Sequence, residues 1–209
     1  MISRRDFCKL TGASALATWL PQEALASPSP SIKVFGIGGA GCNIVEKLRT
    51  QYSLPSGITT ITVNRADEPR SCDMKLGSGI KSPLTEADAS SISSAVYPAD
   101  VVVLVAGMGG LAGTNLTKHF AHAAKAANAQ VVAVLCTPLS FERGRRVKLA
   151  REGLPEIARV ADHVKVIDLE SMVDHLPPKI TIADFFAYAD GQMVKAITDH
   201  VGKTDWSRA

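Results

Sequence analysis

The chain has 209 residues, of which 46% are hydrophobic and 21% are charged, and its formal net charge is +3 at pH 7. These figures predict one globular domain with a substantial core, and they exclude two domains of ordinary size. The small net charge by itself argues neither for nor against binding to nucleic acid.

The first thirty residues differ in character from the rest of the chain. They contain the pair Arg4-Arg5, a weakly apolar stretch over residues 11–20, and Ala24-Leu25-Ala26. This order is typical of a twin-arginine signal peptide with a cleavage site, followed by a short linker, and its apolar stretch is too short for a stable membrane span. We therefore expect export to the periplasm or cell envelope. The alternative is an ordinary or uncleaved leader that leaves the protein in the cytoplasm or tethers it to the inner membrane.

From Ile32 onward, apolar β-type runs alternate with helical patterns. The strands are expected at 32–37, 58–63, 101–106, 131–136 and 164–167, and the helices near 40–51, 84–96, 114–128, 141–160 and 180–201. Such alternation predicts an α/β fold, a doubly wound and mostly parallel Rossmann-like sheet with helices on both faces. The segment from Arg65 to Pro83 has no clear periodicity, and we expect it to be irregular.

Two glycine-rich turns follow the first and third of these strands. The first runs from Gly36 to Gly41 and the second from Gly107 to Gly113. Each places backbone N–H groups at the start of a helix, where the helix dipole and the unpaired donors favour a phosphate. Because ligands of parallel sheets bind at the carboxyl ends of the strands, the two turns together indicate a nucleotide held from two sides.

The first turn also matches the dinucleotide fingerprint at Gly36, Gly38 and Gly41. That fingerprint requires an acidic residue at the end of the second strand, where this chain has Asn64 and Arg65 instead. An exported NAD(P)-binding oxidoreductase with a Rossmann fold therefore remains an alternative.

Several further motifs occur in a recognisable order. They are the first turn, Ile61-Thr62-Val63-Asn64, Ala106 to Gly110, Pro138 to Arg146, and the stretch from Phe186 to Asp190. In order and spacing, these motifs resemble the nucleotide-binding domain of the FtsZ/tubulin superfamily. The resemblance covers residues 31–209 and is closer to FtsZ than to tubulin.

The resemblance implies a GTP- or GDP-binding site, with Mg²⁺ as the companion of GTP. The residues that it assigns to the nucleotide are Gly38, Gly39, Gly41, Asn43, Asn64, Gly109, Gly110, Gly113, Thr114, Glu142, Arg146, Phe186 and Asp190. A carboxylate at position 190 accepts two hydrogen bonds from the edge of guanine, which adenine does not offer. The plainer alternatives are an exposed ion pair for Glu142 and Arg146, core packing for Phe186 and a solvated carboxylate for Asp190.

Some positions depart from the family pattern. Leu111, Ala112 and Asn115 replace small or hydroxyl-bearing residues of the second turn, and the loop that covers the terminal phosphate is expected to be absent. The chain ends at Ala209, just past the last expected helix, so we also expect no C-terminal activation domain. A poorly positioned water makes hydrolysis weak or absent, and no catalytic residue is assigned. The extreme alternative is a pseudo-GTPase that has lost its ligand and binds an FtsZ-like or other protein partner.

Other kinds of site have little support. The four cysteines have no metal-ligand or disulfide spacing, and Cys42 and Cys136 are expected to be small buried residues. His119 and His122 lack a third ligand, so we expect a solvated helix face there and no metal site. The basic residues after Phe141 have no interleaved aromatic side chains, which argues against nucleic acid.

Overall fold

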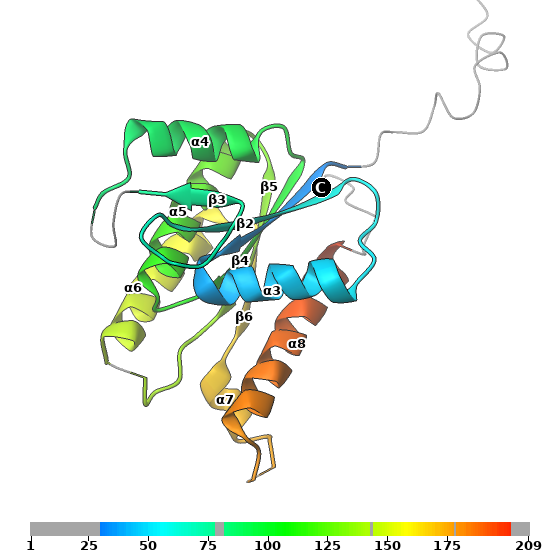
Figure 1. Ribbon diagram of the computed structural model, residues 1–209, viewed down its shortest axis with the longest axis vertical. Coiled ribbons are helices and arrows are strands. Elements are labelled where there is room, and N and C mark those ends of the chain that lie inside the picture. The colour runs from blue at the N-terminus through cyan, green and yellow to red at the C-terminus, as the bar shows by residue number, and fades with distance from the viewer. Residues whose placement is uncertain (1–29, 78–81, 143, 178, 202–209) are drawn as a thin grey trace, which may run out of the picture.

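The protein is built on one six-stranded sheet in which all neighbouring strands are parallel (Figure 1). The computed structural model describes residues 30–77, 82–142, 144–177 and 179–201. The strands are β1 (Ile32–Ile37), β2 (Ile58–Arg65), β3 (Met74–Leu76), β4 (Val101–Gly107), β5 (Gln130–Cys136) and β6 (His163–Ile167), in the order β3-β2-β1-β4-β5-β6. The expected doubly wound parallel sheet is confirmed, because helices cover both of its faces.

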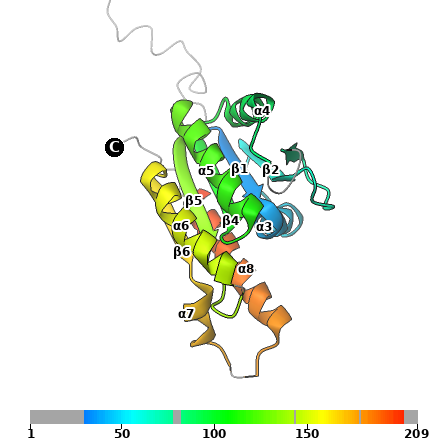
Figure 2. The ribbon, with the colours of Figure 1, turned by 90° about the vertical axis from the view of Figure 1, so that its left-hand side faces the viewer.

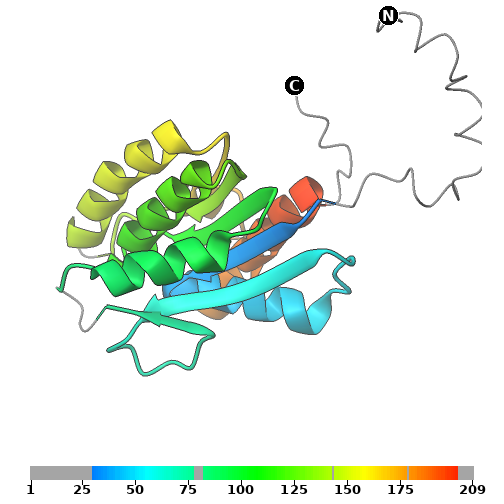
Figure 3. The same cartoon turned by 90° about the horizontal axis from the view of Figure 1, so that it is seen from above.

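The helices divide between the two faces of the sheet (Figures 2 and 3). They are α3 (Gly38–Gln51), α4 (Glu86–Val96), α5 (Leu111–Ala126), α6 (Gly144–Val160), α7 (Leu169–Val173) and α8 (Ile182–Val201). Helices α3, α7 and α8 pack on one face, and α4, α5 and α6 pack on the other. No helix in these described ranges is both long enough and apolar enough to cross a bilayer.

The central strands are apolar on both sides because both faces of the sheet are covered. Along β1, Val34 contributes to the core beneath α3 and α8, whereas Phe35 and Ile37 contribute to the core beneath α4, α5 and α6. Phe35 also packs against Phe120 of α5, with their ring centroids 4.8 Å apart. The alternation of residues along each strand therefore fixes which helix it meets.

Two elements were not expected from the sequence. The short edge strand β3 lies in the segment that was expected to be irregular, and α7 follows β6 directly. Asp73 fastens β3 to β2, because its carboxylate accepts hydrogen bonds from the backbone N–H and the hydroxyl of Thr62. A hydrogen bond from Arg49, followed by those from Thr62, holds the pKa of Asp73 below its usual value. The helix expected near residues 141–160 is α6, which begins at Gly144.

The order of the strands reverses between β1 and β4. The chain leaves β1 toward β2 on one side and continues from β4 toward β5 on the other. The loops that follow β1 and β4 therefore point in opposite directions around the same crevice, which is where doubly wound sheets bind their ligands.

Replacement of Gly191 tests the long helix α8. This glycine lies in the middle of the helix, and a Cβ atom added there meets no heavy atom within 4 Å. We expect Gly191→Ala to raise the free energy of unfolding by about 0.5–1 kcal/mol, because alanine loses less backbone entropy than glycine in a helix. Denaturant unfolding measures the change. A loss of stability in this variant would show that the outer face of α8 is not open.

Candidate functional site

The two glycine turns lie against each other at the crevice between β1 and β4. Gly38 has a φ of +72°, and a Cβ atom added to it would lie 2.8 Å from the amide nitrogen of Gly113. Gly109 has a φ of +91°, and a Cβ atom added to it would lie 2.7 Å from the carbonyl oxygen of Arg146 in the first turn of α6. Both turns therefore require glycine, and their contact brings the N-termini of α3 and α5 together.

Gly41 has a packing role. A Cβ atom at this position would lie 2.2 Å from the carbonyl oxygen of Val105 in β4. The absence of a Cβ atom at Gly41 lets α3 pack closely against the sheet. Gly41 was predicted to contact the nucleotide, but it does not line the pocket described below.

Gly39 and Gly110 are open instead. A Cβ atom added to either residue meets no heavy atom within 4 Å. They stand at the beginnings of α3 and α5, neither of which has a side-chain cap. Among the described residues, the first amide groups of both helices thus have no side-chain cap, and their donors and dipoles are directed at the same pocket. Such an arrangement suits an anion, above all a phosphate.

A pocket of about 770 Å³ opens over the two turns. Its wall includes nine of the residues that the sequence assigned to a nucleotide: Gly38, Gly39, Asn64, Gly109, Gly110, Gly113, Glu142, Arg146 and Phe186. The volume is within the usual range for sites that bind small molecules. Leu111, which we expected to crowd the second turn, lies on the wall and leaves the pocket open.

Asn64 presents a polar group to this pocket. The residue is only 2% exposed, and its side-chain oxygen accepts a hydrogen bond from the backbone N–H of Arg65. Its amide nitrogen has no hydrogen-bond acceptor among the described residues. That nitrogen is therefore a donor available to a bound ligand.

Two other predicted residues have structural partners and lie off the wall of the pocket. The Thr114 hydroxyl is buried and accepts a hydrogen bond from the Gly109 amide at 2.9 Å, which fixes the second turn. The Asn43 side chain accepts a hydrogen bond from Arg70, which also donates to the carbonyl oxygen of Gly39 at 3.3 Å. Arg70 comes from the loop after β2, so this loop is fastened across the start of α3.

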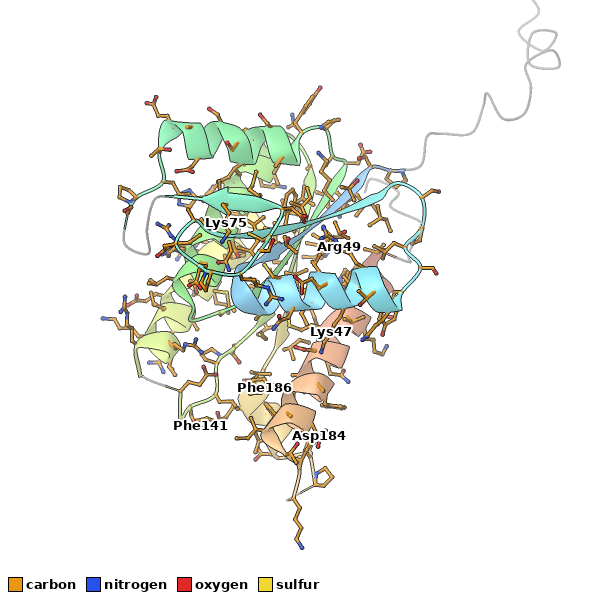
Figure 4. All side chains as sticks on the ribbon, viewed as in Figure 1. Lys47, Arg49, Lys75, Phe141, Asp184 and Phe186 are labelled. Atoms are coloured by element: carbon orange, nitrogen blue, oxygen red, sulfur yellow. The ribbon has the colours of Figure 1, made fainter. Side chains whose placement is uncertain are left out.

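Phe186 and Asp190 occupy successive turns of α8 but have different surroundings. Phe186 is 41% exposed and lines the pocket, so it is not a core residue, and it meets the buried ring of Phe185 edge-on. Asp190 does not line the pocket. Its Oδ2 accepts a hydrogen bond from Lys47 of α3. The Lys47 side chain lies between α3 and α8 (Figure 4). Its Oδ1 has no hydrogen-bond donor among the described residues.

Glu142 and Arg146 form the ion pair that their spacing indicated, and both line the pocket. They do not share a helix face, because Glu142 lies in the loop before α6. A hydrogen bond from the Leu139 amide also holds the Glu142 carboxylate. The loop is attached to α7 through Ser140, whose amide and hydroxyl donate to Glu170.

Sequence reasoning missed part of the wall. The additional polar side chains are Arg65, Glu68, Thr137 and Arg145. The polar wall thus carries three arginines against two glutamates, a balance that favours an anionic ligand. Arg145 adjoins Arg146 in the sequence, and this run of basic residues after Phe141 was the one signal that could have pointed to it.

Cys136 also lines the pocket and is partly buried, where a fully buried residue was expected. Burial, together with the nearby carboxylates of Asp190 and Glu142, raises the pKa of its thiol to about 11. The thiol is therefore protonated at neutral pH. Cys42 is fully buried as expected, and burial likewise raises its pKa to about 11. Within the described ranges, no group of three or more His, Cys, Asp or Glu side chains is placed to hold a metal ion.

Comparisons with known proteins agree that this chain is similar to FtsZ proteins. Residues 77–177 match the model of the tubulin/FtsZ family, GTPase domain. Cell division protein FtsZ 2 of Haloferax volcanii is 32% identical over 193 residues, which cover 82% of this chain and 47% of the relative. Cell division protein FtsZ 1 of Pyrococcus horikoshii is 30% identical over 190 residues, covering 82% and 51%. The chain thus spans about half the length of the curated relatives that it matches.

Solved structures show the same fold. An empty FtsZ dimer from M. jannaschii superposes with a TM-score of 0.72 at 26% identity, covering 96% of this chain and 59% of that one. CetZ2 from Haloferax volcanii, described as a GTPγS-bound protofilament, gives a TM-score of 0.65 at 17% identity, covering 82% and 58%. At this low identity, the similarity to CetZ2 concerns the fold alone.

Proposed function

The chain carries an FtsZ-like domain, similar to the GTPase domain of the tubulin/FtsZ family, and from this premise we propose that it binds GDP or GTP in the pocket over its two glycine turns. The observation that carries the proposal is the meeting of two uncapped helix N-termini at Gly38 and Gly113. Two converging helix dipoles favour one shared anion, as the phosphate chain of a nucleotide provides.

In this proposal, the phosphates lie over Gly39 and Gly110, where no side chain separates a ligand from the backbone. Arg145 and Arg146 supply positive charge from the side of α6. When GTP is bound, Mg²⁺ would accompany it and would neutralise charge on its phosphates. Glycine at positions 39 and 110 fits a bound phosphate chain, because a Cβ atom at either position would project into the space that the phosphates need.

The base is proposed to lie at the other end of the pocket, beside Phe186 and Asp190. Phe186 offers an exposed ring for stacking. The free Oδ1 and the remaining lone pairs of Asp190 can accept hydrogen bonds from the guanine edge, while Lys47 holds the carboxylate in place. The effect of Asp190 on the pKa of Cys136, which lines the pocket, supports a position close to it.

Replacement of Asp190 tests this assignment. We expect Asp190→Ala to weaken GDP binding about tenfold, since it removes charge-assisted hydrogen bonds to guanine. Binding of ADP changes little, because adenine does not present the same donor pair. Fluorescence titration of both nucleotides measures the two affinities.

The matched control is Asp199→Ala. Asp199 lies nine residues later on α8 and is also paired with a lysine, Lys195, but, unlike Asp190, it is not among the charges that act on the pocket residue Cys136. Equal GDP affinity in the two variants would refute the role of Asp190.

We propose that hydrolysis by this pocket is weak or absent. Two carboxylates, Glu68 and Glu142, line it, and Glu142 is engaged by Arg146 and by the amide of Leu139. A poorly oriented water reacts slowly with a terminal phosphate, because phosphoryl transfer depends on positioning and on stabilisation of charge. Absence of binding by any nucleotide, with a protein partner retained, would instead favour the pseudo-GTPase alternative.

We also propose that the leader directs export by the twin-arginine route. Residues 1–29 lie outside the described residues, so this proposal depends on Arg4, Arg5 and the sequence that follows them. Cell fractionation should find the wild type in the periplasm or cell envelope, and Arg4→Lys/Arg5→Lys in the cytoplasm. Cytoplasmic protein in both cases would contradict export.

A further inference from the structure

A second pocket, of about 370 Å³, lies on the face of the sheet that α4, α5 and α6 cover. We call it the α5 groove. It is lined by Arg65, Ser82, Pro83, Leu84, Asn115, Leu116, Lys118, His119, His122 and Glu156. Half of these residues belong to α5, and Glu156 belongs to α6, which runs beside α5 (Figure 2). Arg65 lines both this groove and the pocket over the glycine turns.

Arg65 is a buried cation whose hydrogen bonds are incomplete. The residue is only 5% exposed, and one terminal nitrogen donates to the carbonyl oxygen of Ser82 at 2.8 Å. The buried Nε has no acceptor among the described residues. The guanidinium lies so close to Gly77 that a Cβ atom there would be 2.8 Å from one of its nitrogens. Glycine at this position therefore makes room for the arginine.

Arg65 also forms no ion pair within the described part of the chain. The nearby carboxylate of Asp88 is already engaged, because it accepts hydrogen bonds from the Gly77 amide and from both the amide and the hydroxyl of Thr85. Those hydrogen bonds, with a smaller contribution from the charge of Arg65, hold the pKa of Asp88 low. A buried charge without a direct counter-charge is costly, and a bound anion would compensate it.

The rim of the groove carries further basic groups. Lys118, His119 and His122 lie on the same stretch of α5. Burial, followed by the charges of Lys118 and His122, lowers the pKa of His119. Glu156 of α6 is the carboxylate on the described wall, and Lys118 donates to it at 2.7 Å. Basic groups therefore outnumber acidic ones around this groove.

We propose that the α5 groove binds a compact phosphate-bearing anion, separately from the ligand of the pocket over the glycine turns. Arg65 supplies the buried positive charge, and Lys118 and the two histidines contact the anion at the rim. The volume suits a small ligand, and the excess of basic groups on the wall favours one with more than one negative charge. This proposal does not depend on nucleotide binding in the other pocket.

The test is isothermal titration calorimetry of the full chain with inorganic pyrophosphate. We expect Lys118→Gln to weaken pyrophosphate binding about tenfold, as the loss of a charge-assisted contact does. The matched control is Lys125→Gln. Lys125 lies on the same helix and is also paired with a carboxylate, that of Asp162 at 2.7 Å, but it is outside the groove.

Glu156→Gln should have the opposite effect. It removes a negative charge from the groove and releases Lys118, so we expect pyrophosphate to bind several-fold more tightly. This variant guards against the objection that any loss of binding reflects misfolding.

Gly39→Ala separates the two pockets, because it alters only the one over the glycine turns. Pyrophosphate binding at the α5 groove should survive this change. The proposal is overturned if pyrophosphate does not bind, if Lys118→Gln and Lys125→Gln behave alike, or if Gly39→Ala abolishes binding while Lys118→Gln does not. The last result would place the phosphate site over the glycine turns.

Discussion

Gly41→Ala is expected to lower the free energy of unfolding by about 3 kcal/mol, at the upper end of what overpacking of a core costs. A Cβ atom at this position would lie 2.2 Å from the carbonyl oxygen of Val105 and 3.0 Å from the carbonyl carbon of Gly36. Both neighbours are backbone atoms of the central strands β1 and β4, and neither can rotate away as a side chain could. Helix α3 must therefore move off the sheet, and equilibrium unfolding in denaturant measures the cost.

The control for this prediction is Gly39→Ala, two residues earlier in the same helix. Since an added Cβ atom at Gly39 meets nothing within 4 Å, this variant should be at least as stable as the wild type. If Gly41→Ala changed the stability by less than about 1 kcal/mol, the close approach of α3 to β4 would not be a requirement of the fold.

The second large effect concerns ligand binding. We expect Gly39→Ala to weaken GDP binding at least about tenfold without loss of stability, because the methyl group enters the space where phosphate meets the N-terminus of α3. Gly110→Ala should have a similar effect from the side of α5, since that position is equally open and also lines the pocket. Titration with a fluorescent GDP analogue measures both affinities.

Gly144→Ala is the matched control for these two variants. Gly144 is the first residue of α6 and is open in the same sense, but it does not line the pocket. It should bind GDP as the wild type does. Unchanged affinity in Gly39→Ala would mean that the phosphates do not lie over the start of α3.

Local sequence patterns were sufficient to predict most of the fold and much of the pocket wall. Runs such as Val101 to Ala106 are apolar throughout, which identifies strands that are buried on both faces. The glycine turns that follow β1 and β4 identify the edge of the sheet at which a ligand is expected to bind. Both patterns extend over consecutive residues, so a single sequence reveals them.

Contacts between distant residues could not be predicted in the same way. Lys47 and Asp190 are 143 positions apart, and their pairing depends on how α3 and α8 cross. Arg70 reaches Asn43 and Gly39 only because the loop after β2 folds back over α3. The family pattern assigned Asn43 and Thr114 to the nucleotide, whereas here their side chains fasten the two turns. Strand β3 was not predicted because it is only three residues long. Asp73, the residue just before it, holds it to β2 by accepting a hydrogen bond from the Thr62 amide.

The most direct measurement is a competition titration of the wild-type protein with labelled GDP against unlabelled GDP, GTP, ADP and NAD⁺. We expect GDP and GTP to displace the label, whereas ADP should be at least about tenfold weaker and NAD⁺ should have no effect at comparable concentrations. Absence of GDP binding, or displacement by NAD⁺ as effective as that by GDP, would contradict it.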